Sequence, residues 1–242
     1  RFERATVRVA TPAGALVAAG DGEIDDARVR RLDLSLSAPS LKLAAWAAEG
    51  VTGTLTATGG DRLRAQLALS ARGAAADKAA AKGLTVNLVA DLPYGRDDTL
   101  TGPASAGAVL RASALDAAGW SGEAATARVD LSGALSGTLA APRYNGVASV
   151  TLDAETAKGP GLVLTKAGAG LASQTFDLAF DKGGMTAGGP VSGRAFAGGG
   201  VADVGGHGLN LNGADLRGSG RARLTSAGFD GDLTGAVNAR GG

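Results

Sequence analysis

The sequence contains no cysteine, one histidine and few aromatic residues, and each shortage excludes a class of site. Without cysteine there are no disulfides and no thiolate metal sites. The single histidine, His207, lies in a glycine-rich stretch, where a lone imidazole is typical of a solvated side chain rather than a base or metal ligand. Aromatic residues make up 4% of the chain and are scattered, so they form no platform for stacking nucleobases.

Blocks of like charge are also missing. The 24 basic and 23 acidic residues are mixed along the chain and leave a net charge of +1. This excludes the basic surface that binds nucleic acid or anionic membranes. No serine lies in a Gly-x-Ser-x-Gly elbow, and no glycine cluster matches a phosphate-binding loop. We therefore expect a protein that is not an enzyme, with no catalytic or metal-binding residues, no cofactor and no nucleic-acid partner.

The chain has no run of about 18 apolar residues that could span a membrane, and it shows no signal-peptide pattern. A strand-like alternation starts almost at once, at Ala5, Val7 and Val9. No change of composition marks a linker. We therefore expect residues 1–242 to be one continuous segment of a longer protein, with any membrane anchor or export signal outside it.

Alternation of apolar and polar residues is the dominant pattern, and it recurs from end to end. In the clearest stretch, Leu63, Leu67 and Leu69 alternate with Arg64 and Gln66. Such a period of two is typical of antiparallel strands with one apolar and one polar face. Turn signals such as Gly59-Gly60-Asp61 separate these stretches. The pattern predicts an all-β protein of long antiparallel strands with little helix.

Two stretches are ambiguous. The alanine-rich segment 74–82 is a helix candidate, although a helix this short is marginal. In residues 40–49 a possible helix cap competes with alternation. After Pro39 the odd positions become apolar, and the pattern runs from Leu41 through Ala47 to Val51 and Leu55. We expect a strand there.

Glycine recurs on the apolar side of these strands. Gly53 lies between Val51 and Leu55, and Gly133 lies between Leu131 and Leu135. Glycine inside a strand often marks a bend or a close approach, so these positions would notch the apolar face and permit curvature. Chance recurrence in a chain with 40 glycines is the alternative.

The apolar residues are too small to predict a thick core. Hydrophobic residues make up 45% of the chain, but nearly half of them are alanine. Strands of roughly ten to sixteen residues would span about 33 to 50 Å. Two such sheets could close on each other as a sandwich. Alternatively, one highly twisted sheet could curl into an elongated hydrophobic groove, a β-taco, whose lining is covered by flexible acyl chains.

The strand texture resembles that of a known family. The segments Leu32-Asp33-Leu34-Ser35-Leu36, Val51 to Thr56 and Asp130 to Leu139 are similar to the strands of AsmA-like bacterial envelope proteins, the repeating β-groove family that includes AsmA, TamB, YhdP and YdbH. The resemblance implies a periplasmic protein, anchored in the inner membrane elsewhere in its chain. It also implies phospholipid transport between membranes for outer-membrane lipid homeostasis, without a cofactor. The YdbH type implies a small outer-membrane lipoprotein partner that adds a strand to the sheet.

We therefore hypothesise that the segment binds phospholipid acyl chains along its apolar face. The alternative is a structural or adhesive cell-surface module, built as a β-solenoid or a β-sandwich. In the first case the expected lining is the set of in-facing aliphatic and aromatic residues Leu32, Leu34, Leu36, Leu63, Leu67, Leu69, Leu84, Val86, Leu88, Val129, Leu131, Leu135, Val150, Leu152, Leu162, Leu164, Phe176, Leu178, Phe180, Leu209, Leu211, Phe229, Leu233 and Val237.

Overall fold

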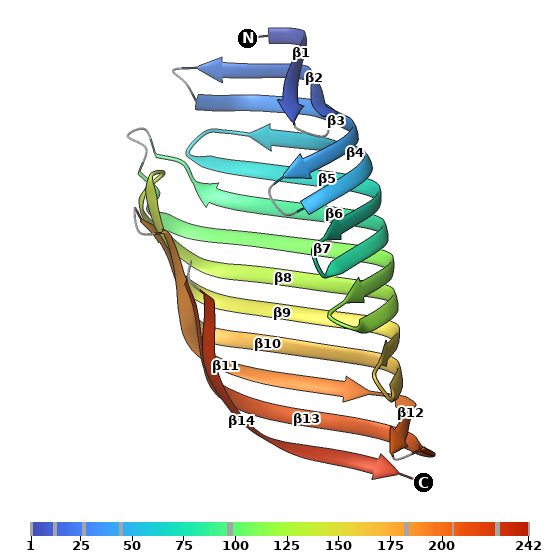
Figure 1. Cartoon of the computed structure of the whole chain (residues 1–242). Coiled ribbons are helices and arrows are strands. Elements are labelled where there is room, and N and C mark those ends of the chain that lie inside the picture. Colours follow the sequence, from blue (N-terminus) through green and yellow to red (C-terminus); the bar gives the residue numbers. More distant parts are fainter. Residues whose placement is uncertain are drawn as a thin grey trace.

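One antiparallel sheet makes up the protein (Figure 1). The computed structural model describes residues 2–11, 14–25, 28–43, 46–95, 99–181, 184–204, 206–225 and 228–241. These residues form strands and turns without a helix, so none of them lies in a helix that could cross a membrane. The all-β prediction is confirmed.

The fourteen described strands are β1 (Phe2–Thr11), β2 (Gly14–Asp25), β3 (Arg28–Leu43), β4 (Trp46–Thr58), β5 (Arg62–Ala76), β6 (Ala79–Pro93), β7 (Gly102–Ala117), β8 (Trp120–Thr138), β9 (Ala141–Gly159), β10 (Leu162–Asp181), β11 (Gly184–Ala197), β12 (Gly199–Val204), β13 (His207–Thr225) and β14 (Gly228–Gly241). From β1 to β11 each strand pairs with the next. Because β11 and β12 both lie between β10 and β13, they act as one strand interrupted at Gly198.

The two ambiguous stretches are both hairpins. Residues 74–82, the helix candidate, are the end of β5 and the start of β6, and Ala74 pairs with Ala81. A short isolated helix is marginal, whereas these alanines extend a ladder that is already formed. Residues 40–49 are in strands as expected, but β3 ends at Leu43, and Leu41 pairs with Ala48. The prediction that Leu41 and Ala47 share a face was wrong, because the chain reverses between them.

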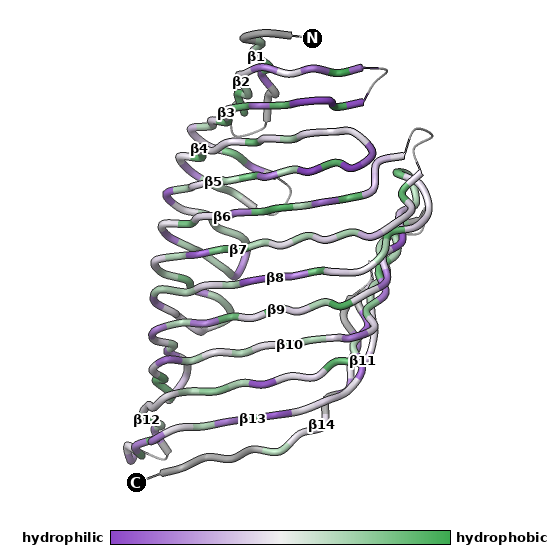
Figure 2. The backbone as a smooth tube through the Cα atoms, turned by 180° about the vertical axis from the view of Figure 1, so that it is seen from behind, coloured by the Kyte–Doolittle hydropathy of each residue, from purple (hydrophilic) through white to green (hydrophobic). Residues whose placement is uncertain are grey.

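The sheet curls instead of lying flat. Figure 1 shows the strands running side by side and bending back together on the right, and the ends of the last strands, in orange and red, turn up on the left. Figure 2, seen from behind, shows hydrophobic and hydrophilic residues alternating along these strands. Close contacts between strands are confined to hydrogen-bonded neighbours, apart from marginal approaches such as that of β1 to β3. The fold is therefore a single curled layer.

A line of left-handed residues crosses the sheet where the pleat is interrupted. Gly50, Gly83, Ala124 and Lys166 have φ values of 60°, 57°, 50° and 50° and belong to the alternate strands β4, β6, β8 and β10. The registers align them in one line, which we call the corner row. At this line the alternation of less and more exposed residues shifts by one position in each strand, while the pairing register is kept. The shift keeps apolar residues on one side of the sheet around the corner.

Gly53 and Gly133 lie on the apolar side, as predicted, but not in the corner row. A Cβ atom at Gly53 would lie 2.2 Å from the carbonyl oxygen of Ala68 and 2.6 Å from Cδ2 of Leu69. Glycine is therefore required there by close approach of the neighbouring strand.

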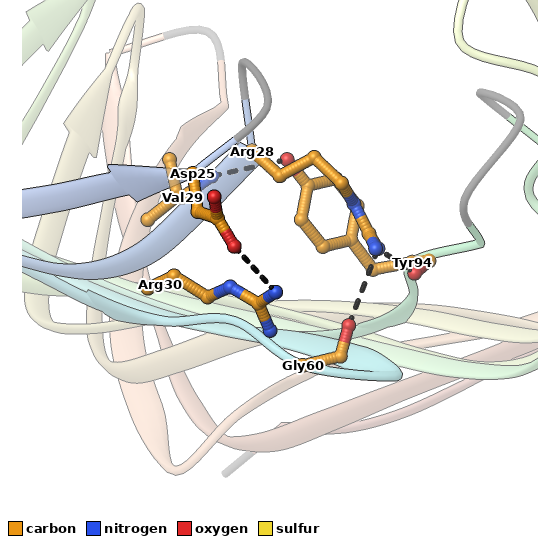
Figure 3. Close-up of polar contacts among 6 residues, drawn as sticks. All are labelled: Asp25, Arg28, Val29, Arg30, Gly60 and Tyr94. Atoms are coloured by element: carbon orange, nitrogen blue, oxygen red, sulfur yellow. Dashed lines mark hydrogen bonds and ion pairs between the residues drawn. The ribbon is translucent and has the colours of Figure 1, made fainter.

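Arg28, at the start of β3, contacts two other segments at one side of the sheet, at Gly60 and Tyr94 (Figure 3). Its Nη2 donates hydrogen bonds to the carbonyl oxygens of Gly60, at 3.2 Å, and of Tyr94. Its guanidinium carbon lies 4.4 Å from the centroid of the Tyr94 ring, and the backbone N–H of Val29 donates to the Tyr94 hydroxyl at 3.4 Å. The start of β3, the turn before β5 and the segment after β6 are thus held together.

The corner row predicts that replacing an alanine by glycine inside a strand will stabilise the protein. A non-glycine residue in the left-handed region is strained by roughly 1–2 kcal/mol, whereas glycine inside a strand normally destabilises by roughly 0.5–1 kcal/mol relative to alanine. We expect Ala124→Gly to raise the free energy of unfolding by up to about 1 kcal/mol, as measured by urea denaturation. The control is Ala127→Gly in the regular part of β8, which should lower it. Equal losses in both variants would contradict this origin of the bend.

Candidate functional site

The registers align apolar residues of successive strands into rows that cross the whole sheet. Residues directly opposite in an antiparallel pair share a face. One row, the central row, runs through Gly20, Leu34, Leu55, Leu67, Leu88, Ala108, Val129, Val150, Leu171, Gly193, Gly218 and Gly235. We call the side of the sheet that carries this row the apolar face, and the opposite side the polar face.

The structure places the sequence-predicted lining residues on this one face. The ladder pairs that show it include Leu36 with Gly53, Leu69 with Val86, Ala127 with Leu152, and Leu164 with Ala157. The predicted residues with described side chains are Leu32, Leu34, Leu36, Leu63, Leu67, Leu69, Leu84, Val86, Leu88, Val129, Leu131, Leu135, Val150, Leu152, Leu162, Leu164, Phe176, Leu178, Phe180, Leu209 and Leu211. The side chains of Phe229, Leu233 and Val237 lie outside the described part, although their backbone belongs to β14.

Sequence reasoning missed several members of the same face. Leu110 pairs with Val86 and Ala127, and Leu171 pairs with Val150. Leu110 lies in the alanine-rich strand β7, where small residues hide the alternation. Leu171 was missed because the register shifts between Ser173 and Phe176, so that the apolar positions change from odd to even. No local pattern in the sequence marks this shift, so Leu171 could be assigned only from the pairing of β9 and β10.

The apolar face is partly shielded in the first half of the sheet and open in the second. In β5, Leu63, Leu67 and Leu69 are half-buried, while Arg64 and Gln66 on the polar face are exposed. In β9 and β10, by contrast, the apolar-face residues Val150, Leu152 and Leu171 expose 42–46% of their surface. Since all the described strands belong to one sheet, the shielding comes from the curl of that sheet and from neighbouring side chains. A closed sandwich does not describe this protein.

Large side chains are not fully buried anywhere in the described residues, and the most buried apolar positions are mainly alanines such as Ala38, Ala57 and Ala125. Fully burying a leucine or valine contributes roughly 1.5–3 kcal/mol. Most leucines here leave part of this stabilisation unrealised. An external apolar ligand on this face could supply it.

Two polar side chains interrupt the rows of the apolar face. The Tyr144 hydroxyl donates a hydrogen bond to the carbonyl oxygen of Val147 at 2.7 Å, and burial raises the pKa of this phenol. Ser173 is 4% exposed, and its Oγ has no hydrogen-bond partner among the described residues. Neither group is paired with a base or an acid that would make it a nucleophile.

The polar face carries ion pairs between neighbouring strands. The Asp91 carboxylate lies 2.6 Å from Nε of Arg62 and 3.4 Å from Nε of Arg64. Asp215 is held in the same way by Arg194, at 2.6 Å, and Arg217, at 3.2 Å. The hydrogen bond from the nearest arginine is the main reason that the pKa of each carboxyl is below its usual 3.8. These carboxylates are neutralised in place, which suits a structural role.

His207 lies at the start of β13, pairs with Val204 and is exposed. Across the portion of the chain that is described, no group of three or more histidine, cysteine or acidic residues could hold a metal ion. Among the described residues, the apolar face is the candidate site that spans the most strands.

No protein-family model matches the chain, and neither a curated protein nor a solved structure shows significant similarity to it. The capacity of the apolar face therefore has to be derived from its residues.

The Arg62–Asp91 pair predicts a specific pH dependence. Because the folded protein lowers the pKa of Asp91, the ionised carboxylate stabilises the fold above the pKa of the unfolded chain. This contribution is lost as the pH falls through the folded pKa. A double-mutant cycle with Arg62→Gln and Asp91→Asn should give a favourable coupling in urea denaturation at pH 7 that declines between pH 5 and pH 2. A coupling that does not change over this range would contradict the assignment.

Proposed function

We propose that the protein transports phospholipid between membranes without catalysing a reaction, by binding acyl chains along its apolar face. The observation that carries this proposal is the continuity of the face: aliphatic rows cross the sheet, and Val150, Leu152 and Leu171 expose 42–46% of their surface on it. Contiguous exposed apolar patches beyond a few hundred Å² are rare on soluble monomers and mark binding sites.

The chemistry of the face favours a hydrocarbon partner over a protein partner. Protein interfaces are centred on tyrosine, tryptophan and arginine anchors. Here the central row contains only leucine, valine, alanine and glycine. The strands between the edge strands β1 and β14 have ladder partners on both sides, so the face itself offers few hydrogen-bonding groups to a partner's polar atoms. An acyl chain has no polar atoms to satisfy.

The direction of the rows suits transport along the sheet. Neighbouring strands are about 4.8 Å apart, so the rows cross the sheet over about 60 Å. An alkyl chain moving along the central row meets no charged side chain, so no step requires a charge to be desolvated. Binding is therefore similar from strand to strand, which permits sliding.

The cellular setting that we propose comes from the resemblance to AsmA-like proteins. It comprises the periplasm, inner- and outer-membrane components as partners, and a small outer-membrane lipoprotein that adds a strand to the sheet. In this setting the apolar face would shield acyl chains from water between the two membranes.

Two exposed valines on opposite faces provide the test. Val150 is 45% exposed on the apolar face, and Val89 is 51% exposed on the polar face, between Gln66 and Gly107. We expect Val150→Asp to weaken binding of phosphatidylethanolamine with a fluorescent acyl chain at least tenfold, because desolvating the charge costs several kcal/mol. Val89→Asp should bind like the unmodified protein. The rate of lipid transfer between donor and acceptor vesicles should likewise fall in Val150→Asp and stay unchanged in Val89→Asp.

Circular dichroism of both variants should be unchanged, since both valines are largely solvent-exposed. Equal binding by Val150→Asp and the unmodified protein would refute the site. Absence of lipid binding by the unmodified protein would refute the function and leave the structural or adhesive module as the alternative.

A further inference from the structure

The inner corner formed by β9, β10, β11 and β13 contains a hollow that is distinct from the rest of the apolar face. Its volume is about 340 Å³, and its lining is almost entirely apolar. An apolar cavity of about 150 Å³ is large enough to take up benzene. We call this hollow the corner slot.

The floor of the corner slot is a row of four alanines, one from each strand. Ala154 of β9 pairs with Ala167 of β10, and Ala197 of β11 pairs with Ala214 of β13. In the first half of the sheet the same row contains larger residues. Val51 of β4 and Leu84 of β6 lie in it on either side of Ala71 of β5. The small side chains of this floor leave room for the hollow.

Leucines form the two walls of the slot. Leu152 and Leu216 stand on one side of the alanine floor, and Leu164 and Leu211 stand on the other. Because the slot extends over four strands about 4.8 Å apart, it runs about 14 Å along the sheet. The slot is thus long, narrow and parallel to the rows.

Few polar atoms line the slot. Asp215 contributes to the lining, but its carboxylate is paired with Arg194 and Arg217 on the polar face. The backbone groups of its four strands are used in the ladder. A peptide in the slot would leave its own N–H and C=O groups without partners, which is costly in an apolar site. A hydrocarbon chain has no such groups.

We propose that the corner slot holds one alkyl chain lying across β9, β10, β11 and β13, and that it is the resting site of a lipid acyl chain on the apolar face. This inference depends on the lipid-binding function proposed above. It adds a position, a single-chain stoichiometry and an orientation. The rest of the face then serves as the route by which a chain reaches or leaves the slot.

Filling the floor provides the first test. Ala154→Leu places a larger side chain in the slot, and Ala68→Leu is the matched control, at an exposed position of β5 on the polar face. Each methylene buried in the slot should raise affinity about fourfold, the fold-change that about 0.8 kcal/mol corresponds to. For saturated fatty acids of increasing length, affinity should therefore rise with each carbon and then level off. Ala154→Leu should level off at shorter chains and bind palmitate at least tenfold more weakly, while Ala68→Leu should match the unmodified protein.

A second measurement needs no variant. A palmitate analogue with a photoreactive diazirine at the chain end should crosslink to Leu152, Leu164 or Leu211 of the unmodified protein, as mapped by mass spectrometry of its peptides. Crosslinks confined to β3–β6, or identical chain-length profiles for Ala154→Leu and Ala68→Leu, would overturn the slot and leave lipid binding standing. No crosslinking and no palmitate binding at all would overturn both.

Discussion

The backbone ladder of a single antiparallel sheet is the interaction on which the rest of the structure depends. In most domains two layers bury a common core. Here the described strands contact hydrogen-bonded neighbours, and the most buried apolar residues are chiefly alanines. The ladder aligns the strands in register, and the register determines which side chains meet. Because strand pairing holds the sheet together without a second layer, the apolar side is free to serve a partner.

The corner row reconciles curvature with a continuous apolar face. If a strand bent without interrupting its pleat, apolar and polar residues would have to alternate without a break through the bend. Instead, a left-handed residue in alternate strands shifts the alternation by one position, and the partner strand shifts at the same level. Gly50 and Gly83 adopt this conformation easily, whereas Ala124 and Lys166 do so at a cost in strain. The strain is tolerated because both neighbouring strands impose the same bend.

The two halves of the apolar face differ in a way that bears on ligand binding. In its first half the central row contains four consecutive leucines, from Leu34 to Leu88, and it ends with three glycines, Gly193, Gly218 and Gly235. Large side chains fill the curl in the first half, while small ones leave the corner slot hollow in the second. An acyl chain would accordingly lie on top of the leucines in one half and sink between them in the other. This difference gives a simple basis for unequal affinity along one route.

By itself, the sequence determined the strands and their two faces, because a period of two is a local property that neighbouring residues carry. Leu63, Leu67 and Leu69 could be assigned to one face from spacing alone, and the change of parity after Pro39 was visible in the letters. Only the tertiary structure decided that this change marks a corner, that the chain reverses between Leu41 and Ala48, and that Leu171 joins the central row. Those features depend on register between strands, and the energies that set it come from pairing partners distant in sequence. The openness of the apolar face is likewise a tertiary property, since alternation is the same in a sheet that is covered and in one that is not.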